Sequence, residues 1–514
     1  MKVQKVQLWI ACVLLGLLTA CAATESPTTP AGTSTESTSD GAKVVPELVI
    51  AQTAEVPTLD AQLNWTMIGR NIYYQMYGYL TRHDENMVVV PELAESWELV
   101  DDLTMRWHLR EGVTFHNGEP FNAEAMKYSL ERILDEDTGA PWRAVLTWID
   151  HIEVVDEYTV DVTAQFPTTA QLLEVGRMPM VPPQYLAEVG AEAFAEAPIS
   201  AGPWKFVEWI KGDRVVLERN MDYWSGPPSV ERLVFRVVPE ATTALAELQV
   251  GTLDIANIAP EACDMLNASD NAHCVAARSI QNVRLVFTND TEDINVRKAI
   301  AHAINVDSII ENIMNGQAVK SVGPLSQLVW GADPDLSGYA YDPDMAQQLL
   351  DEAGYAPGEL TIPLHFAEGR IAKGREVAEA IAGDLEKVGI MVDLQPAEYG
   401  VWFDDFYGGT MSGMSLSAST ATTADPNQMF RDYRLESCVG YYCSEELDAY
   451  LVPVNEVVDP DERLPLVRAA EDYVFDEVLW IQLYDVDLLY GVSNKVDWEP
   501  VPNDIKWILS AQPR

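Results

Sequence analysis

The chain has 514 residues and carries 80 acidic residues against 33 lysines and arginines, which gives a formal net charge of -47. Phosphate binding needs clustered lysine and arginine side chains, so this charge excludes nucleic acid as a partner. Residues 46–514 are too many for one hydrophobic core and contain no apolar run long enough to cross a membrane, so we expect a soluble body with more than one domain.

The first twenty residues have the pattern of an export signal. Two lysines precede an apolar run over residues 8–18, which is shorter than the about 20 residues of a membrane span. Residues 18–21, LTAC, resemble the lipobox of bacterial lipoproteins, and this resemblance implies a signal peptide over residues 1–20 and a lipid on Cys21. An ordinary secretory signal with a chance cysteine is the alternative. Residues 21–45 have little apolar content, so they predict a flexible tether.

Strand patterns dominate the first half of the chain. Residues 104–115 place Met105, Trp107 and Leu109 on one face and then reach a turn at 111–112, so they predict a hairpin arm. Residues 151–164 and 204–218 repeat this pattern, with turns at 156–157 and 211–213. A helix is predicted over residues 122–134, with Asn122 as its cap and an apolar stripe at Met126, Leu130 and Ile133.

The second half alternates strands with helices. Residues 342–354 predict a helix that begins at Asp342, continues with Pro343 and stops at Gly354; its apolar stripe is Ala346, Leu349, Leu350 and Ala353. Residues 360–366, 374–389 and 390–396 predict a strand, a helix and a strand. This order is typical of a parallel sheet covered by helices, so the predicted fold class is α/β, in more than one lobe.

Four cysteines remain after the N-terminal region: Cys263, Cys274, Cys438 and Cys443. In an exported protein four cysteines allow three disulfide connectivities. We favour the two local pairs, Cys263 with Cys274 and Cys438 with Cys443. A zinc site is the weaker interpretation, because only His273 lies beside one of these cysteines.

The motifs of common enzymes are absent from the sequence. Seven scattered histidines form no His-Glu-x-x-His motif, and no Gly-x-Ser-x-Gly elbow or phosphate loop occurs. The sequence therefore predicts no enzyme and no cofactor, with an envelope hydrolase as a remote alternative. Repeats that would indicate an envelope scaffold are also absent.

Five segments in order resemble one known family. They are residues 93–133, 200–228, 244–256, 295–316 and 341–355, which read LAESWELVDDLTMRWHLREGVTFHNGEPFNAEAMKYSLERI, SAGPWKFVEWIKGDRVVLERNMDYWSGPP, ALAELQVGTLDIA, NVRKAIAHAINVDSIIENIMNG and YDPDMAQQLLDEAGY. Together they are similar to the extracellular solute-binding proteins of family 5, which serve ABC importers of peptides and nickel. The resemblance implies a substrate-binding lipoprotein that delivers its solute to the transmembrane permease subunits. We expect a monomer on the outer face of a bacterial membrane, periplasmic or extracellular.

The resemblance also implies a fold, a two-lobed periplasmic-binding-protein clamshell of type II with an inserted subdomain. The family's layout places lobe I at residues 46–66, 197–280 and 487–514, the insertion at 67–196 and lobe II at 281–486. The chain would then cross between lobes near Val283–Phe287 and near Tyr484–Tyr490.

The identity of the solute depends on residues 415–430, SLSASTATTADPNQMF. In peptide-binding relatives this segment carries a tryptophan and then an aspartate that pairs with the α-amino group of the peptide. When Asp425 is set on the family's Asp-Pro pair, Ser419 and Thr422 stand near those two positions, so both family residues are missing. A free peptide N-terminus should therefore bind poorly unless Asp425 or Asp404 substitutes, since a buried ammonium needs an anionic partner.

The candidate ligand-binding residues implied by the resemblance are Trp65, Trp402, Ser417, Ser419, Thr422 and Asp425. Hydroxyls and aromatic rings suit a neutral polyhydroxyl solute or a blocked peptide, although the same hydroxyls can instead cap the backbone of a loop. A peptide or peptide-sized solute is the leading prediction, and an oligosaccharide or another uncharged solute is the alternative. Nickel is disfavoured because the sequence offers no compact group of histidine or cysteine ligands.

Overall fold

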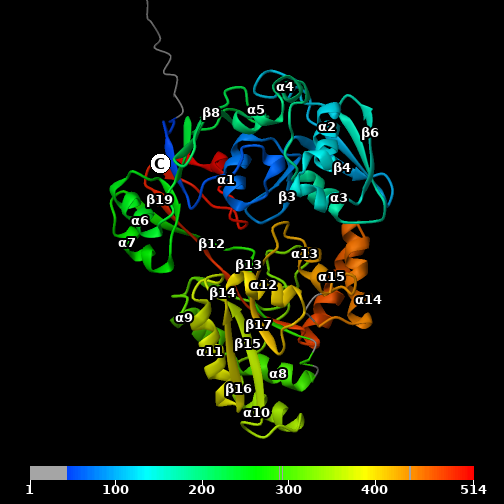
Figure 1. The fold of residues 1–514 in the computed structure, drawn as a ribbon, viewed down its shortest axis with the longest axis vertical. Coiled ribbons are helices and arrows are strands. Elements are labelled where there is room, and N and C mark those ends of the chain that lie inside the picture. Colours follow the sequence, from blue (N-terminus) through cyan, green and yellow to red (C-terminus); the bar gives the residue numbers. More distant parts are fainter. Residues whose placement is uncertain (1–42, 289, 292, 439–441) are drawn as a thin grey trace, which may run out of the picture. The chain divides into compact units, whose positions relative to one another are not determined.

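The computed structural model describes residues 43–514 except 289, 292 and 439–441 (Figure 1). The predicted signal peptide, Cys21 and nearly all of the predicted tether lie outside the described residues. Within the described part of the chain, every helix is too short or too polar to span a lipid bilayer.

The first large sheet combines strands from three distant parts of the sequence. In the described residues it has seven strands in the order β12-β19-β11-β1-β10-β9-β8. Central β1, with the sequence LVIAQ, is almost entirely buried and runs parallel to both β10 and β11, as expected for an apolar strand covered on two faces. The strands are β1 (Leu48–Gln52), β8 (Trp204–Ile210), β9 (Arg214–Arg219), β10 (Arg232–Val237), β11 (Ile255–Asn257), β12 (Ala272–Ala277) and β19 (Leu488–Ser493).

The second large sheet is formed by the following half of the chain. Its six strands, counted in the described residues, have the order β14-β18-β13-β17-β15-β16, and β15 is parallel to both β16 and β17. Helix α11 (Gly374–Lys387) connects β15 to β16, which confirms the predicted strand, helix and strand. The strands are β13 (Gln281–Phe287), β14 (Ala318–Lys320), β15 (Leu360–Ala367), β16 (Ile390–Ala397), β17 (Met414–Thr420) and β18 (Trp480–Val486).

Two short links join these sheets. The first is residues 278–280, between β12 and β13, and the second is Asp487, between β18 and β19. The crossing predicted near Val283–Phe287 lies a few residues after the first link, in residues that pair with β17 and β18 inside the second sheet. The predicted crossing at Tyr484–Tyr490 does contain Asp487. The Ser279 hydroxyl donates to the carbonyl oxygen of Val486 at 2.6 Å, so the two links touch.

A third sheet has the order β4-β5-β7-β6 and contains β4 (Ala94–Leu99), β5 (Thr104–Leu109), β6 (Ile149–Asp156) and β7 (Thr159–Ala164). The predicted strand at residues 104–109 is confirmed, and its apolar face is buried. Its hairpin partner is the preceding strand β4, however, and not the chain after the turn at Gly112. The hairpins predicted at 151–164 and 204–218 are both confirmed, as the pairs β6 with β7 and β8 with β9.

Capping side chains mark the predicted helices. Helix α2 (Ala123–Leu134) starts where Asn122 Oδ1 accepts the N–H of Ala125 at 3.1 Å, and α10 (Pro343–Glu352) starts at Asp342 in the same way. The other helices are α1 (Met67–Met76), α3 (Ala170–Gly176), α4 (Pro183–Val189), α5 (Ala191–Glu196), α6 (Ala241–Val250), α7 (Cys263–Asn267), α8 (Ile294–Ala303), α9 (Val306–Asn312), α12 (Tyr399–Tyr407), α13 (Pro426–Phe430), α14 (Glu445–Glu456) and α15 (Pro460–Asp476).

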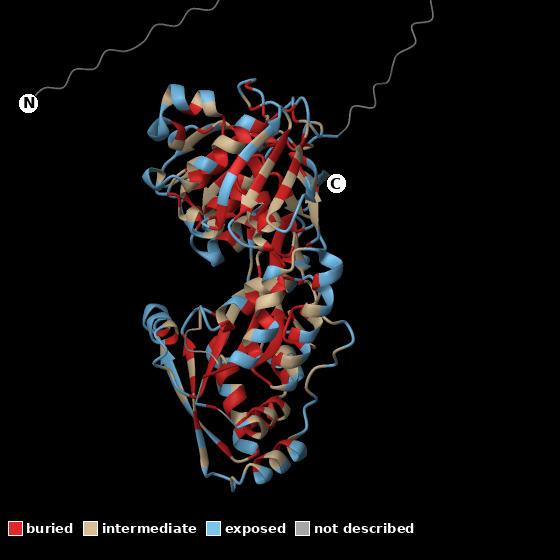
Figure 2. Ribbon diagram, turned by 90° about the vertical axis from the view of Figure 1, so that its right-hand side faces the viewer, coloured by how far each residue is buried: buried red, intermediate tan, exposed pale blue. Residues whose placement is uncertain are grey.

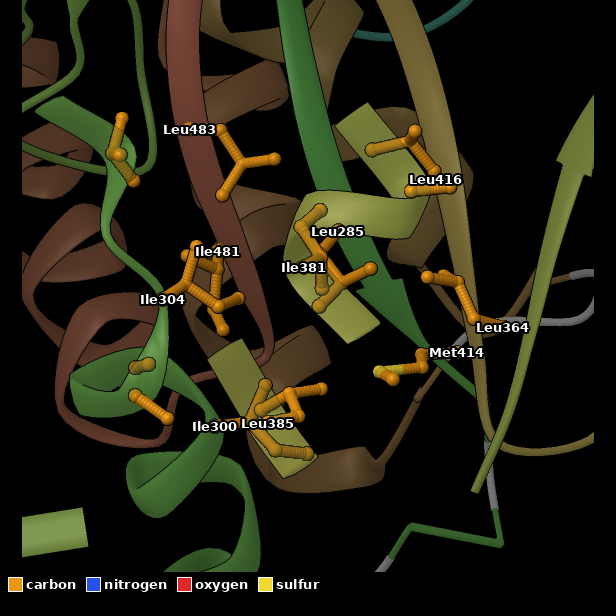
Figure 3. Close-up of a cluster of buried hydrophobic side chains, with 14 of the residues drawn as sticks. Leu285, Ile300, Ile304, Leu364, Ile381, Leu385, Met414, Leu416, Ile481 and Leu483 are labelled. Atoms are coloured by element: carbon orange, nitrogen blue, oxygen red, sulfur yellow. The ribbon is translucent and has the colours of Figure 1, made fainter. Parts of the chain in front are cut away.

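Apolar side chains of the second sheet pack under helices α8 and α11. Leu285, Leu416 and Leu483 come from three neighbouring strands and are fully buried with Ile300 of α8 and Ile381 of α11 (Figure 3). Buried residues follow the strands of both large sheets (Figure 2). The opposite face of the second sheet carries another buried apolar cluster, in which Val286 of β13 and Trp480 of β18 join residues of helices α12, α14 and α15.

The predicted domain boundaries stay a prediction. Helix α1 begins inside the expected insertion, yet its residues Ile72, Tyr73 and Met76 belong to the same hydrophobic core as β1 and β10. The third sheet and α2 have a separate core around Trp107 and Leu130.

The structure pairs Cys263 with Cys274 and Cys438 with Cys443, the two local pairs favoured by the sequence. The Cα atoms lie 5.0 Å apart in the first pair and 6.2 Å apart in the second. Both separations lie in the range that disulfides allow.

Candidate ligand-binding site

A pocket of about 90 Å³ lies on the face of the second sheet opposite the core of α8 and α11. Side chains alternate along β17, so Met414 and Leu416 enter that core while Ser417 and Ser419 lie on the other face. Residues 416–419 all line the pocket. On the neighbouring strand β13, Arg284 stands directly opposite Ser417. The strand register therefore places a guanidinium beside a row of hydroxyls.

Arg284 is only 3% exposed and is surrounded by aromatic rings. Its guanidinium carbon lies 5.7 Å from the ring centre of Tyr433 and 5.8 Å from that of Trp480. Cation–π attraction of this kind helps to stabilise a buried arginine. Arg284 thus brings a guanidinium to the lining of the pocket.

Helix α12 forms an aromatic wall of the pocket. Trp402 is buried, donates its indole N–H to the hydroxyl of Ser415 at 3.1 Å and stacks on Phe406 with ring centres 4.8 Å apart. Tyr399 and Phe403 line the same pocket and are each about 40% exposed. A second arginine, Arg370, lies with its guanidinium carbon 5.9 Å from the ring of Tyr399.

Asp425 lies outside the pocket and pairs with Arg463. Its carboxylate accepts two hydrogen bonds from Arg463, at 2.6 and 2.7 Å, and one from the backbone N–H of Asn427. Both side chains are 7% exposed. Asp425 therefore already pairs with a charge of this chain and does not line the pocket as a substitute anion for a peptide ammonium.

The other predicted residues divide between the pocket and its surroundings. Trp402, Ser417 and Ser419 share the pocket. Thr422 lies outside it, and its hydroxyl accepts a hydrogen bond from the side-chain amide of Gln428 at 3.3 Å. Trp65 also lies outside and packs edge-on against Trp142, with ring centres 6.0 Å apart. Asp404 is an exposed residue of α12 and does not line the pocket.

Sequence reasoning missed Arg284, Arg370 and Asp432, which line the pocket. One signal in the sequence could have identified Arg284, since this residue interrupts the apolar run VRLVF at residues 283–287. Asp432 supplies a carboxylate whose side chain is 22% exposed and which pairs with the more exposed Arg431 at 3.3 Å. No cluster of three or more metal-ligating side chains occurs among the described residues.

Two α/β sheets joined by two short links, with a pocket of arginines, aromatic rings and hydroxyls on one of them, define a protein that binds a small solute. The model of the bacterial extracellular solute-binding proteins, family 5, middle region, matches residues 88–440, and the chain belongs to this family. Proteins of this family are the substrate-binding components of ABC importers and are not enzymes, and they are located in the periplasm or outside the cell.

Known relatives match along most of their length. The glutathione-binding protein GsiB of Pectobacterium atrosepticum is 28% identical over 456 residues, which cover 84% of this chain and 86% of that protein. The di/tripeptide-binding protein 2 of Pseudomonas aeruginosa is 26% identical over 438 residues, 77% of this chain and 81% of that protein. The structure of HbpA2 from Haemophilus parasuis matches with a TM-score of 0.82 at 22% identity and covers 91% of this chain and all of that chain. The predicted fold class, α/β of the type II periplasmic-binding kind, is confirmed.

Proposed function

We propose that the chain captures a peptide or peptide-sized solute that carries a carboxylate, with Arg284 and Arg370 as the groups that recognise this carboxylate. The observation that carries the proposal is the presence of two arginines in one small pocket of a protein whose net charge is -47. A guanidinium presents parallel N–H donors that match a carboxylate. The names of two relatives, which bind glutathione and di- or tripeptides, agree with this class of solute.

The remaining lining suits the rest of a peptide. Tyr399 and Phe403 offer ring faces to an apolar side chain, and Ser417 and Ser419 offer hydroxyls to its backbone. Asp432 is the carboxylate of the pocket, so it is the candidate partner for an α-ammonium in place of the missing family aspartate. Trp402 supports the wall through its bond to Ser415. Among the residues implied by the family resemblance, we therefore retain Trp402, Ser417 and Ser419.

An uncharged solute such as an oligosaccharide is the second candidate. The exposed rings of Tyr399 and Phe403 favour it, since aromatic faces provide flat apolar surfaces beside the hydroxyls of Ser417 and Ser419. In that case the two arginines would contribute hydrogen bonds without pairing with a negative charge.

The solute is then delivered to the transmembrane permease subunits of an ABC importer. We further propose that the mature protein starts at a lipidated Cys21, that residues 21–45 tether a monomeric body to the membrane, and that the lobe boundaries follow the family's layout. The apolar run at residues 8–18 and the LTAC sequence at 18–21 support the anchor.

Calorimetric titration with matched ligands tests the recognition of the carboxylate. Tripeptides with a free C-terminus should bind at least tenfold more tightly than the same peptides with a C-terminal amide, and Arg370→Gln should abolish this preference. Arg370 is exposed, so the substitution should leave the fold intact. Arg375→Gln is the matched control, because Arg375 is also exposed but pairs with Glu368 outside the pocket. Equal binding of acid and amide, or binding of oligosaccharides alone, would overturn the proposal.

A further inference from the structure

A second pocket, of about 300 Å³, lies on the first sheet, at the edge where the parallel strands β1, β10 and β11 end. Gln52 is the last residue of β1, Val238 follows β10, and Asn257 is the last residue of β11, and all three line the pocket. The chain forms β10 on one side of β1 and then β11 on the other, so the direction of strand addition reverses here. Ligands of open α/β sheets bind beside such a reversal, outside the carboxyl ends of the strands.

Lys506 brings a buried ammonium to this pocket. The residue is 3% exposed and lines the pocket. Among the described residues, no hydrogen bond or ion pair reaches its Nζ atom, which lies 5.4 Å from the ring centre of Tyr490. Burial lowers the pKa of Lys506, and the carboxylate of Asp504 opposes this shift. A buried ammonium without a hydrogen-bond partner is costly in a folded protein, which points to a ligand that supplies one.

The carboxylate of Asp504, although it is close in sequence, is not a hydrogen-bond partner of the Lys506 ammonium. Asp504 accepts a hydrogen bond from the hydroxyl of Tyr490 and another, at 3.3 Å, from the side-chain amide of Asn257. It also holds a backbone φ of 62°, a left-handed conformation that few side chains adopt. The surrounding structure therefore holds Asp504 through its Oδ1 atom, which accepts both of these hydrogen bonds, and no hydrogen bond or ion pair joins the carboxylate to Lys506 among the described residues.

Helix α1 fixes Lys506 in the same way. Asn71 Oδ1 accepts the backbone N–H of Lys506 at 3.0 Å, and the side-chain amide of Gln75 donates to the Lys506 carbonyl oxygen at 2.6 Å. Both partners are buried. The position of the lysine is thus set before any ligand arrives, which lowers the entropy cost of binding.

The start of helix α6 adds a second positive feature to the pocket. Its first residue, Ala241, lines the pocket, and the side chain of the N-cap residue Glu240 makes no capping hydrogen bond. The first-turn N–H groups of a helix and its dipole favour an anion at this end. Lys506 and the N-terminus of α6 therefore both favour an anionic group of a ligand.

We infer that this pocket is a second subsite, which binds an acidic group of the transported solute as the ion-pair partner of Lys506. The inference rests on the proposed function and narrows it. A solute whose first carboxylate is held by Arg284 and Arg370 on the second sheet carries a further carboxylate for the first sheet. Acidic peptides meet this requirement, whereas neutral peptides of the same size do not.

The peptides Ala-Glu-Ala and Ala-Gln-Ala, which differ in one acidic group, test the inference by calorimetric titration. The wild-type protein should bind the glutamate peptide at least tenfold more tightly, and Lys506→Met should reduce this preference below threefold while it leaves the glutamine peptide unaffected. Lys211→Met, at an exposed lysine on another surface, is the control and should change neither value. A preference for the glutamate peptide that survives in Lys506→Met overturns the inference. If both peptides are lost only in Arg370→Gln, the proposed function stands without the inference.

A second measurement decides the case in which neither peptide binds. In protein labelled with ¹³C at the lysine ε-carbons, the resonance of Lys506 is the one absent from Lys506→Met. Glutarate should shift this resonance and raise its titration midpoint, and the uncharged glutaramide should not. A Lys506 resonance that glutarate leaves unmoved overturns the inference, whatever the fate of the proposed function.

Discussion

Arg463 and Asp425 form a buried two-pronged ion pair that joins α15 to the start of α13, with N···O distances of 2.6 and 2.7 Å. Arg463 also donates to the carbonyl oxygen of Val454 in α14. The pair thus connects three helices that cover the second sheet. Asp425 is the N-cap residue of α13, so one carboxylate both starts a helix and neutralises a buried cation.

Removal of this carboxylate should destabilise the protein strongly. In Asp425→Ala the guanidinium of Arg463 stays buried without its counter-charge, which typically costs about 3–5 kcal/mol. Urea unfolding followed by tryptophan fluorescence measures the change. Asp404→Ala is the control, because Asp404 is exposed on α12 and should change stability by less than about 0.5 kcal/mol. An Asp425→Ala variant as stable as the control would contradict the structural role given to this pair.

Glu92 should make stability depend on pH in the neutral range. The residue is 1% exposed, and burial raises the pKa of its carboxyl from 4.5 to about 8, against the opposing effects of Arg82 and Arg110. Between these values the folded state keeps the proton that the unfolded state releases, so stability falls as pH rises through this window. Glu92→Gln has no ionisable carboxyl at this position, so its stability should not fall with pH in this way. Its free energy of unfolding should exceed that of the wild type by about 3 kcal/mol at pH 7 and should differ little at pH 4.

The check is the free energy of unfolding of both proteins at each pH. The exposed Glu85 provides a matched control, since Glu85→Gln should track the wild type throughout. A difference between Glu92→Gln and wild type that stays constant from pH 4 to pH 7 would show that Glu92 titrates normally in the folded protein.

The disulfide between Cys263 and Cys274 should stabilise the fold without being required for it. The bond closes a loop of 11 residues, for which the chain-entropy model gives about 2–3 kcal/mol. The double variant Cys263→Ala and Cys274→Ala should therefore fold and unfold at lower denaturant. Reductant should lower the stability of the wild type by more than that of the variant, in which only the bond between Cys438 and Cys443 remains to be reduced. Peptide mapping without reduction verifies the pairing itself, and free thiols at these positions would contradict it.

Cys21 should determine membrane attachment. After expression in a bacterium, the wild-type protein should partition with membranes and show a lipidated N-terminal cysteine by mass spectrometry, because several acyl chains hold a protein stably. Cys21→Ser should be released in soluble form with its solute affinity intact. If Cys21→Ser stays in the membrane fraction, the export segment itself is the anchor.

Local patterns in the sequence were sufficient for the helices and hairpins that were predicted from them, which are a minority of the elements in the described residues. The helix at α10 and the strand, helix and strand of β15, α11 and β16 were predicted because caps and apolar periods lie within a few residues of each other. The exact position of the first link could not be predicted, because a strand's own pattern does not tell which sheet it joins. Only the pairing of β13 with β17 and β18 assigns residues 283–287.

The candidate site was harder to predict for the same reason. The family resemblance makes Asp425 a candidate ligand contact, and the sequence does not reveal its structural partner because Arg463 lies 38 residues away on another helix. Arg284 could not be predicted as a site residue, because it lies opposite Ser417 on a strand that is far away in the sequence. Trp402, Ser417 and Ser419, which were predicted from family resemblance, do share one pocket.

Arg284 and Arg370 line the pocket of a molecule whose net charge is -47. An anionic solute therefore meets a negative electrostatic potential far from the molecule, and it meets the positive charge of these two side chains only when it is close to them. At low ionic strength an anionic solute is repelled during diffusion and attracted only in the last few ångströms. Salt at physiological strength screens charges over about 8 Å and therefore removes mainly the long-range repulsion. The association rate of such a solute should rise with added salt, the reverse of ordinary electrostatic steering, while its dissociation rate changes little.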